Sequence, residues 1–313
     1  MPELPEVETI KLGLEKKIIG LKIQKIQVIS PKTFIGNSQE AEGQIVLKVW
    51  RRGKILGVDL SGNITLLFHL KMSGQLVLIQ KSKIKNQNDK SKFKNEDKFI
   101  GGHPTEDMLG KMPNAHTRVI FTLQSQEKQK SRLLPLATSH LYFNDQRKFG
   151  WVKVVRSTIL SERSESKDLG KLGPEPLEKG FTWQVLKQNL LKHKNWPIKV
   201  AIMDQTVVAG VGNIYANEAC FDAKLDPRTK VSDLSDQQLH LLYRGIIKSL
   251  KDGIAHGGST RAHFVDPQGH KGYFLDYALV YWRDKHPCKV CGTEIKKIAL
   301  GGRGTYFCSG CQK

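Results

Sequence analysis

Four cysteines in the C-terminal part of the chain have the spacing of a zinc ribbon. Cys288 and Cys291 form one C-x2-C pair, and Cys308 and Cys311 form the other. Each pair can place two thiolates on one ion at about 2.3 Å, and a closed tetrahedron of four thiolates leaves no position for a reacting water. The pattern therefore predicts one structural Zn²⁺ per chain, and two disulfides are the alternative.

The first residues offer a second kind of chemistry. Removal of Met1 would leave Pro2 at the terminus, with a secondary amine as its reactive group. A terminal amine titrates near pH ~8, so a useful fraction is neutral and nucleophilic at physiological pH. Its attack on a sugar C1′ gives a cationic iminium, which favours elimination of phosphate. Glu3 can serve as general acid and base, although acidic residues before a helix also serve capping and the helix dipole.

Basic residues outnumber acidic ones in this chain. Fifty Lys and Arg residues stand against thirty Asp and Glu, which gives a formal net charge of +20 at pH 7. Such a field concentrates polyanions at the surface, so it predicts nucleic acid as the partner. A lysine-rich tail is the alternative source of charge, but the segment 80–98, with seven lysines and three acids, supplies only part of the excess.

Composition and the first residues argue against a membrane-spanning or exported protein. No run approaches the roughly 20 apolar residues that span a bilayer. Residues 1–20 lack an uninterrupted apolar region and include Glu3, Glu6 and Glu8, so neither a secretory signal nor a transit peptide is expected. We therefore expect a cytoplasmic protein, nucleoid-associated if bacterial, that acts as a monomer without a membrane partner or an organic cofactor.

Periodicity predicts a β-rich first half. A helix is expected over 5–19, and short β-type runs from 22 to 155 predict a β-sandwich or barrel. The polar segment 80–98, continuing through Gly101 and Gly102, has too little apolar content to fold alone. It predicts a disordered or mobile loop between strands.

The second half is predicted to be helical after a polar, Pro-rich linker. Helices are expected over 182–193, 198–204, 211–223 and 235–255, the last with Ser235 and Gln238 as a capping box. The expected domain limits are 1–155 for a catalytic β domain with an insertion at about 80–112, 156–178 for the linker, 179–256 for a helical DNA-binding module and 257–313 for a capping loop and zinc domain.

Seven motifs give the chain a family resemblance. They are PELPEVETI at the start, RRGKILGVDL at 51–60, HLKMSGQL at 69–76, DQRKFG at 145–150, LGPEPL at 172–177, MDQTVVAGVGNIYANEACF at 203–221 and the four-cysteine ribbon. Together they resemble the formamidopyrimidine-DNA glycosylase family, over nearly the whole chain apart from about 80–112 and 124–138. The resemblance implies an α+β fold with an N-terminal β-sandwich flanked by helices, a helix–two-turn–helix module and a C-terminal four-cysteine zinc ribbon hairpin.

The resemblance also implies an activity and its residues. The family's enzymes are bifunctional DNA glycosylase/AP lyases of base excision repair, which remove oxidised purines such as 8-oxoguanine and formamidopyrimidines from duplex DNA and nick the strand by β,δ-elimination. By resemblance, Pro2 is the Schiff-base nucleophile and Glu3 the proton donor. Lys54 contacts phosphate and supports β-elimination, and Arg303, at the tip of the zinc hairpin, binds phosphate and is linked to δ-elimination. A solvated surface position is the alternative for Lys54 and Arg303.

An enzyme that acts on a base inside a duplex must flip the base out and fill the gap. By resemblance, Met72, Arg147 and Phe149 fill that void, and a core position is the alternative for Met72 and Phe149. The glycines of the motif at 210–212 predict backbone amides that approach phosphate at a helix start. The other DNA contacts implied by the resemblance are Asn213 on phosphate, with His116, Lys194 and Lys199 on the backbone or at the lesion.

Two other functions stay open at this point. The loop 257–274 reads Arg261, Ala262 and His263 where the family more often has Leu-Arg-Asp, so the lesion preference is open. One alternative is an endonuclease VIII-like glycosylase for oxidised pyrimidines, although the residues that follow Pro2 and Glu3 favour the purine branch. The other is a non-catalytic zinc-ribbon DNA-binding protein.

Overall fold

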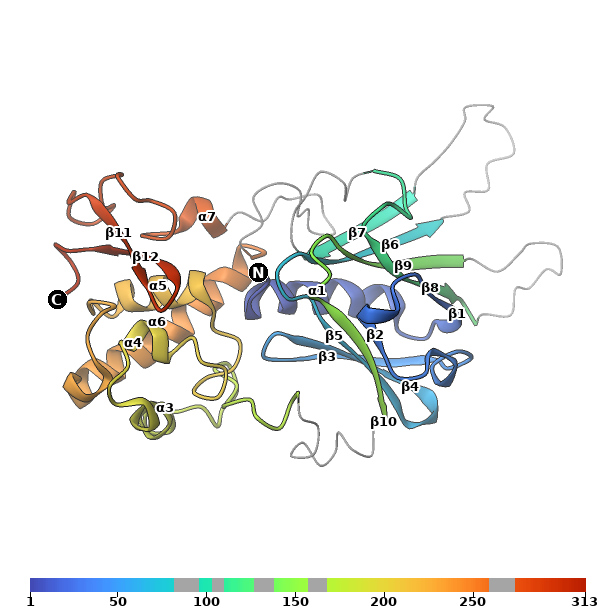
Figure 1. Ribbon diagram of the computed structural model, residues 1–313, viewed down its shortest axis with the longest axis horizontal. Coiled ribbons are helices and arrows are strands. Elements are labelled where there is room, and N and C mark those ends of the chain that lie inside the picture. The colour runs from blue at the N-terminus through green and yellow to red at the C-terminus, as the bar shows by residue number, and fades with distance from the viewer. Residues whose placement is uncertain (82–95, 103–109, 127–137, 157–167, 259–273) are drawn as a thin grey trace.

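Two five-stranded sheets form the first half of the computed structural model, which describes residues 1–81, 96–102, 110–126, 138–156, 168–258 and 274–313 (Figure 1). One sheet runs in the order β1 (Lys22–Val28), β8 (Thr117–Gln124), β9 (Thr138–Asp145), β6 (Gly74–Lys81) and β7 (Glu96–Gly102). The other runs in the order β2 (Phe34–Ile35), β10 (Trp151–Arg156), β5 (Ile64–His69), β4 (Ile55–Leu60) and β3 (Val46–Arg52). Among these strands every pairing is antiparallel except that of β2 with β10.

The core of the sandwich lies between the two sheets. Phe68 on β5 and Phe121 on β8 have ring centroids 5.6 Å apart, and the Phe143 ring on β9 lies 6.5 Å from that of Phe68. All three rings are buried, because alternate side chains of a strand face one side of its sheet. The predicted sandwich is confirmed.

Helix α1 (Leu4–Ile18) covers the side of the sandwich where the edge strands β3 and β7 of the two sheets lie (Figure 1). Its apolar stripe, Val7, Ile10, Leu14 and Ile18, is buried. At the helix start, the Glu3 amide donates to the Glu6 carboxylate at 2.7 Å. The helix thus continues from the sandwich core to a terminus that projects beyond the sheets.

Strand β7 corrects the prediction of a loop through residues 80–102. It pairs with β6 from Gln75 opposite Gly102 to Lys81 opposite Glu96. Phe99 anchors the strand, because its buried ring packs where a Cβ on Gly13 of α1 would lie only 2.1 Å from Phe99 Cε2. A short apolar stretch within a polar segment therefore folds as a strand, because it pairs with β6 and its Phe99 ring packs against α1. Within the predicted insertion at about 80–112, residues 82–95 and 103–109 lie outside the described residues.

The second half contains the predicted helices, with shorter limits. They are α3 (Trp183–Leu190), α4 (Ile198–Ala201), α5 (Asn213–Asp222) and α6 (Asp236–Ala255). The short helix α7 (Phe274–Tyr277) was not predicted. The capping box of α6 is confirmed, since Gln238 N donates to Ser235 Oγ and Ser235 N to Gln238 Oε1. The predicted helix at 211–223 starts only at Asn213, because Gly210 has φ +89° and Gly212 is extended. The zinc hairpin is β11 (Ile295–Leu300) and β12 (Arg303–Cys308), and single 3₁₀ turns are η1 (Pro31–Thr33), η2 (Ser38–Glu40), η3 (Ser61–Asn63), η5 (Leu191–His193) and η6 (Val231–Asp233).

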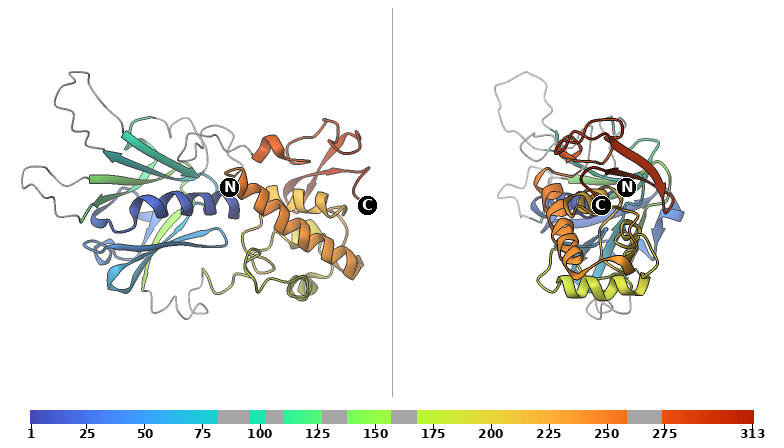
Figure 2. Two further views of the ribbon diagram at one scale, coloured as in Figure 1. Left: turned by 180° about the vertical axis from the view of Figure 1, so that it is seen from behind. Right: turned by 90° about the vertical axis from the view of Figure 1, so that its left-hand side faces the viewer.

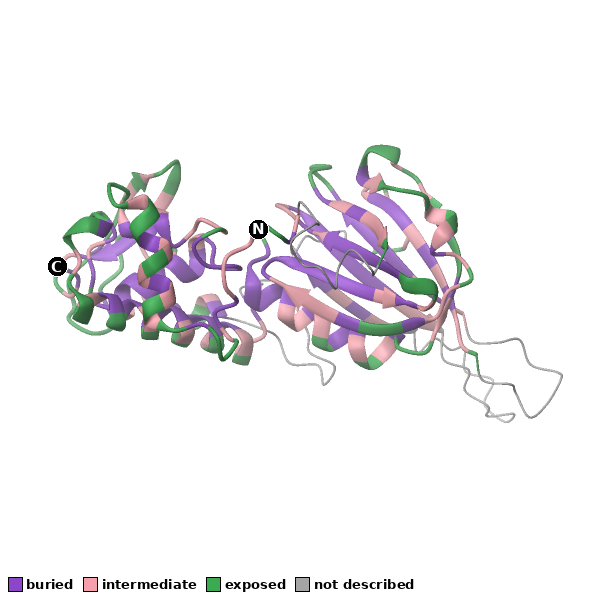
Figure 3. Cartoon of the chain, turned by 90° about the horizontal axis from the view of Figure 1, so that it is seen from below, coloured by how far each residue is buried: buried purple, intermediate pink, exposed green. Residues whose placement is uncertain are grey.

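The two halves form two lobes, and the N-terminus lies where they meet (Figure 2 and Figure 3). The side chain of Leu4 belongs to the apolar core of the helical lobe, whereas Val7 and the rest of the α1 stripe belong to that of the sandwich. Among the residues that the structure describes, none of the helices is long and apolar enough to cross a membrane.

Candidate active site

The chain terminus is fixed between the lobes by backbone contacts. The Leu4 amide donates to the Gly210 carbonyl at 3.0 Å. A Cβ on Gly210 would lie 2.6 Å from Leu4 Cβ, so only glycine allows this approach. Pro2 is buried beside these residues, and Met1 is exposed. The predicted nucleophile therefore lies at the junction of the lobes.

Glu3 is buried against the first turn of α5. Its Oε1 accepts from the Ile214 amide at 3.0 Å, and its Oε2 accepts from the Tyr215 amide at 3.4 Å. A Cβ on Gly212 would lie 2.3 Å from Glu3 Cδ. The glycine motif predicted to bring helix amides to phosphate instead admits this carboxylate, because a helix start binds any anion that reaches it.

The terminal amine, Glu3, Lys54 and Arg303 act on one another electrostatically. Burial raises the pKa of Glu3, and the charge of Lys54 opposes that rise. Burial lowers the pKa of Lys54, which Glu3 opposes and Arg303 reinforces. Burial also lowers the pKa of the terminal amine, carried here by Met1, with Glu3 opposing and both Lys54 and Arg303 reinforcing the change. The structure thus brings together the residues predicted from the resemblance.

Lys54 is not a solvated surface lysine. It lies in the turn between β3 and β4, and only 7% of the residue is exposed. A buried ammonium needs negative charge nearby, and Glu3 and Glu6 are the groups that favour its charged form. The surface alternative weighed from the sequence is therefore wrong for Lys54.

Arg303 begins β12 and lies exposed at the hairpin tip. Gly301 and Gly302, with φ of +56° and +69°, make the tight turn expected from the glycines around it. Asn213 Nδ2 at the start of α5 donates to the Gly304 carbonyl at 3.1 Å, and Lys199 Nζ donates to Asn213 Oδ1. Burial lowers the pKa of Lys199 to about 8. The two predicted DNA contacts Asn213 and Lys199 therefore also hold the hairpin against the helical lobe.

Two loops carry the predicted void-filling residues and are bonded to each other. Met72 lies between β5 and β6, and Arg147 and Phe149 lie between β9 and β10. Ser73 Oγ donates to Asp145 Oδ1 and accepts from the Arg147 amide at 3.0 Å. The Arg147 guanidinium lies 5.1 Å from the centroid of the Phe149 ring.

Exposure separates these side chains from the core. Phe149 is 56% exposed and Met72 is half-buried, so the core alternative is wrong for Phe149. His116 joins the same loops, since its carbonyl accepts from the Asp145 amide at 2.9 Å. Lys194 is exposed at the end of η5, where its carbonyl accepts from the Ser232 amide at 2.9 Å. That contact fixes the backbone of Lys194 to the turn η6. It does not bring Lys194 to the terminal amine and Glu3.

The four cysteines fit one zinc ion. Their sulfur atoms lie within 4.8 Å of one another, with Cys288 and Cys311 sulfurs 3.9 Å apart and Cys291 and Cys308 sulfurs 3.4 Å apart. A tetrahedron with zinc–sulfur bonds of about 2.3 Å has sulfur atoms roughly 3.8 Å apart. The cluster also closes the C-terminal core, in which Ile295, Tyr306 and Phe221 are buried.

Comparison with known proteins assigns the chain to a family. The family model described as the formamidopyrimidine-DNA glycosylase N-terminal domain matches residues 1–152. The formamidopyrimidine-DNA glycosylase H2TH domain matches residues 172–264, and a zinc finger found in FPG and IleRS matches residues 285–313. A Listeria innocua protein named formamidopyrimidine-DNA glycosylase is 36% identical over 318 aligned residues, with both chains fully covered. The chain belongs to the formamidopyrimidine-DNA glycosylase family.

Further members of the formamidopyrimidine-DNA glycosylase family agree in sequence and fold. A Pelotomaculum thermopropionicum glycosylase is 36% identical and matches 100% of this chain and 99% of its own. A Lactococcus lactis FPG mutant in complex with Fapy-dG DNA has a TM-score of 0.77, 29% identity and full coverage of both chains. The Thermus thermophilus MutM (FPG) protein has a TM-score of 0.75, 32% identity and coverage of 99% and 98%. The predicted fold class and the zinc finger are confirmed.

Three residues beside the candidate site were not predicted from the sequence. Tyr215 donates its hydroxyl to Glu6 at 2.7 Å, and burial raises the pKa of Tyr215 well above its usual range. Tyr281 is bonded to Asn213, and burial raises its pKa to about 12. His69 Nδ1 accepts from the Lys71 amide at 3.0 Å, and burial, aided by Lys71, lowers the pKa of His69 to about 3.

These three residues differ in how visible they are in the sequence. His69, neutral at physiological pH with Nε2 as its donor, stands inside HLKMSGQL, so the motif itself was a signal. Tyr215 also stands inside a motif, that at 203–221, but its contact with Glu6 cannot be read there. Tyr281 lies outside the motifs and gains its place only through its contact with Asn213, far away along the chain.

Proposed function

We propose that this chain removes oxidised purines from duplex DNA with the amine of Pro2 as its nucleophile and then nicks the strand by β,δ-elimination. Oxidised purines are the substrate class of the family, and relatives have been solved with DNA containing Fapy-dG, an abasic site and carbocyclic 8-oxo-G. The observation that carries the residue assignment is the position of Pro2, which is buried where the lobes meet, next to the Glu3 carboxylate that the Ile214 and Tyr215 amides hold. The surroundings of the terminus also favour a neutral amine, because burial, Lys54 and Arg303 lower the pKa of the Met1 amine that stands there. A lowered pKa leaves more of the amine neutral and able to attack.

The proposed reaction uses the Pro2 nitrogen to displace the damaged base from C1′. Glu3, whose pKa is raised by burial, keeps a proton available to the deoxyribose as its ring opens. Loss of a C2′ proton from the iminium then expels the 3′ phosphate, and a second elimination expels the 5′ phosphate. We assign Lys54 to the phosphate beside the reacting sugar and Arg303 to the phosphate expelled in the second step.

The proposed DNA contacts follow from exposure. Met72, Arg147 and Phe149 lie on two bonded loops, with the last two exposed, as a wedge into the base stack requires. We propose His116, Lys194, Lys199 and Asn213 as contacts to the backbone or the lesion. The four cysteines hold a zinc ion that supplies no reacting position and keeps the hairpin folded.

We also propose the oligomeric state, the cellular location and the domain limits that the sequence predicts. The chain acts as a monomer in the cytoplasm, associated with the nucleoid if the source is bacterial. Its units divide as expected from the sequence, at 155, 178 and 256. A single chain suffices, because the terminal amine, Glu3, Lys54 and Arg303 all come from one molecule.

Borohydride trapping tests the proposal. Duplexes with 8-oxoguanine opposite cytosine, an oxidised pyrimidine or an abasic site are incubated with the processed protein, a Pro2→Gly variant and a form that retains Met1. The proposal expects a covalent complex that requires a free Pro2 and forms best with 8-oxoguanine. Preferential trapping on the pyrimidine lesion would instead identify an endonuclease VIII-like enzyme. Binding without trapping on any duplex would leave a non-catalytic DNA-binding protein.

A further inference from the structure

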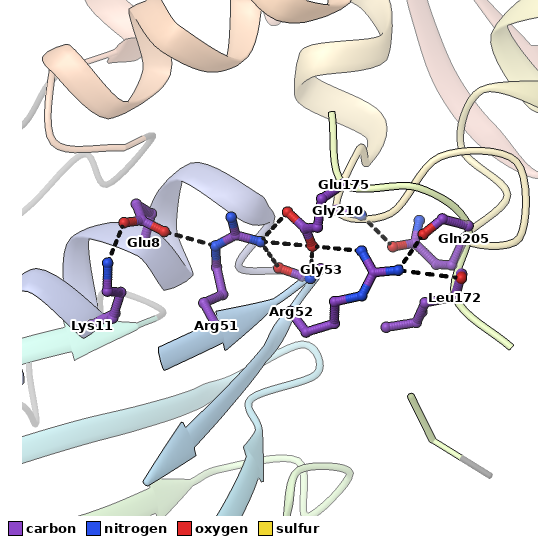
Figure 4. A network of polar contacts seen from close by, with 10 residues as sticks. Glu8, Lys11, Arg51, Arg52, Gly53, Leu172, Glu175, Gln205 and Gly210 are labelled. Carbon is purple, nitrogen blue, oxygen red and sulfur yellow. Dashed lines mark hydrogen bonds and ion pairs between the residues drawn. The ribbon is translucent and has the colours of Figure 1, made fainter. Parts of the chain in front are cut away.

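One buried carboxylate from the segment that joins the two lobes holds the turn that carries Lys54. The Glu175 side chain is 2% exposed. It accepts from Arg51 Nη1, at 2.9 Å to one oxygen and 3.1 Å to the other, and from the Gly53 amide (Figure 4). It also forms an ion pair with Arg52 Nη1 at 3.3 Å. Three consecutive residues before Lys54 are therefore bound to Glu175.

The two guanidiniums depend unequally on Glu175. Arg51 has a second acidic partner, because its Nε donates to Glu8 Oε2 at 2.8 Å. Arg52 Nη2 donates to the Gly173 carbonyl at 2.7 Å, but its buried Nη1 has no hydrogen-bond acceptor among the described residues. Among the described residues, only the negative charge of Glu175 compensates the positive charge at Arg52 Nη1. Removing one member of a buried ion pair is costly, because the other is left without compensation.

The turn also lies directly against the helical lobe. Gly53 has φ +55°, and a Cβ at this position would be 3.4 Å from both Ala209 Cβ and Leu172 Cδ1. The helical lobe also provides the Ile214 amide that binds Glu3. Lys54 and Glu3 are thus both fixed to the helical lobe, although both belong to the first half of the chain.

We propose that Glu175 is a positioning residue for Lys54, which it fixes relative to the terminal amine and Glu3 through Arg51, Arg52 and Gly53. Glu175 touches neither the DNA nor the reacting atoms in this assignment. Its effect on strand cleavage is transmitted by Lys54. This inference rests on the proposed function, because it concerns the task assigned there to Lys54.

A double-mutant cycle of Glu175→Gln and Lys54→Met tests the assignment. The rate measured is single-turnover β-elimination at a preformed abasic site, per folded molecule, with the folded fraction taken from thermal unfolding. With Lys54 present, Glu175→Gln should slow cleavage by about 10- to 100-fold, the scale expected for small misplacement of a reacting group. With Lys54→Met, the same change should alter the rate by no more than about twofold, because no ammonium remains to be misplaced.

Glu8→Gln is the matched control. It removes the other acidic partner of Arg51 but leaves the Glu175 bonds to Arg51 and Gly53 in place, so the rate should stay within about twofold of the parent. If Glu175→Gln does not fold, Gly53→Ala takes its place in the cycle. That change strains the turn without removing a charge, and it should show the same dependence on Lys54.

The outcomes separate the inference from the function on which it rests. Equal slowing by Glu175→Gln with and without Lys54 would overturn the positioning role while trapping on the parent protein still supports the enzyme. A Lys54→Met variant that cleaves like the parent would overturn both the role of Lys54 and that of Glu175. Absence of trapping on the parent protein would remove the proposed function itself.

Discussion

At the scale of single residues, the reactivity of the terminus depends on what surrounds it. Glu3 has its raised pKa because it is buried, and the terminal amine has its lowered pKa because of burial and of two cations brought from residues 54 and 303. The same residue types in water would titrate at ordinary values. Substitutions that alter the surroundings should therefore change the chemistry without touching Pro2.

Lys54→Met should move the acid limb of Schiff-base formation to higher pH. The neutral amine is the reactive form and exists above its pKa, which burial lowers and the charge of Lys54 lowers further. Without Lys54 the pKa of the amine rises, so activity is lost at a higher pH as the solution is acidified. Rates of borohydride trapping on abasic DNA over a pH series measure this limb. Lys16→Met, at an exposed position in the last turn of α1, should leave it in place, and an unchanged limb in Lys54→Met would contradict the prediction.

Gly212→Ala should lower both stability and excision. The new Cβ would lie 2.3 Å from Glu3 Cδ, so the carboxylate must leave the amides of Ile214 and Tyr215 or the helix must shift. Overpacking of this kind costs about 1–3 kcal/mol in the free energy of unfolding. Gly180→Ala is the control, because a Cβ there meets nothing within 4 Å. Denaturant unfolding and excision of 8-oxoguanine are the measurements, and equal behaviour of the two variants would refute the role given to Gly212.

At the scale of elements, an uninterrupted hydrophobic pattern predicted the helices correctly, whereas the interrupted pattern around β7 hid a strand. The stripe on α1 and the capping box of α6 are local patterns, and both were found where expected. Strand β7 was missed because Phe99 is its main anchor and the partner of that ring, Gly13, lies on α1. The fold of each lobe could thus be predicted from the sequence, but this long-range pairing could not.

The candidate site shows the same division between local and long-range information. Its residue types were recognisable from motifs, whereas their assembly depends on contacts such as that of Glu3 with Ile214 and that of Asn213 with Gly304. Glu175, in the segment predicted to be a linker, is the clearest case. Its sequence neighbours are prolines and glycine, and only the fold places it beside Arg51.

Removal of zinc should disable strand cleavage while leaving the sandwich folded. The hairpin that carries Arg303 is closed at one end by the four cysteines, and without the ion four thiolates would repel one another. Chelation, or Cys291→Ser, should release about one zinc per chain and abolish cleavage of abasic DNA. Hydrogen exchange in β5 and β8 should stay slow. Cleavage at the parent rate in a metal-free protein would show that the hairpin folds without the ion.

At the scale of the whole molecule, the excess of positive charge should govern affinity for DNA. With a formal net charge of +20, the field attracts any duplex, and specific contacts act on top of that attraction. Because cations on the protein release counterions from phosphates, binding must weaken as salt rises. The contribution of each residue proposed to bind the DNA backbone can then be measured separately.

Lys194→Ala should reduce the salt dependence of duplex binding. Removing one ammonium that binds a phosphate should lower the magnitude of the slope of log K against log[salt] by about 0.9. The reduction should be similar for damaged and undamaged duplexes, because binding to a phosphate carries no sequence information. Fluorescence titrations across a salt series measure the slope. Lys16→Ala, at the far end of α1, is the control, and an identical slope for the two variants would exclude Lys194 from the interface.

The division of the site along the chain sets an order of events during synthesis. Pro2 emerges from the ribosome first, whereas Ile214, Tyr215 and Arg303, which bury or polarise its surroundings, emerge much later. Until then we expect the terminus to be a solvent-exposed amine that the peptidase which would remove Met1 can reach and that reacts poorly with a sugar. We therefore expect Met1 to be removed early, while the chain is still being made. We expect cleavage of DNA only after the hairpin of β11 and β12 has folded. A chain that ends before this hairpin lacks Arg303, so we expect it to leave an abasic site uncut.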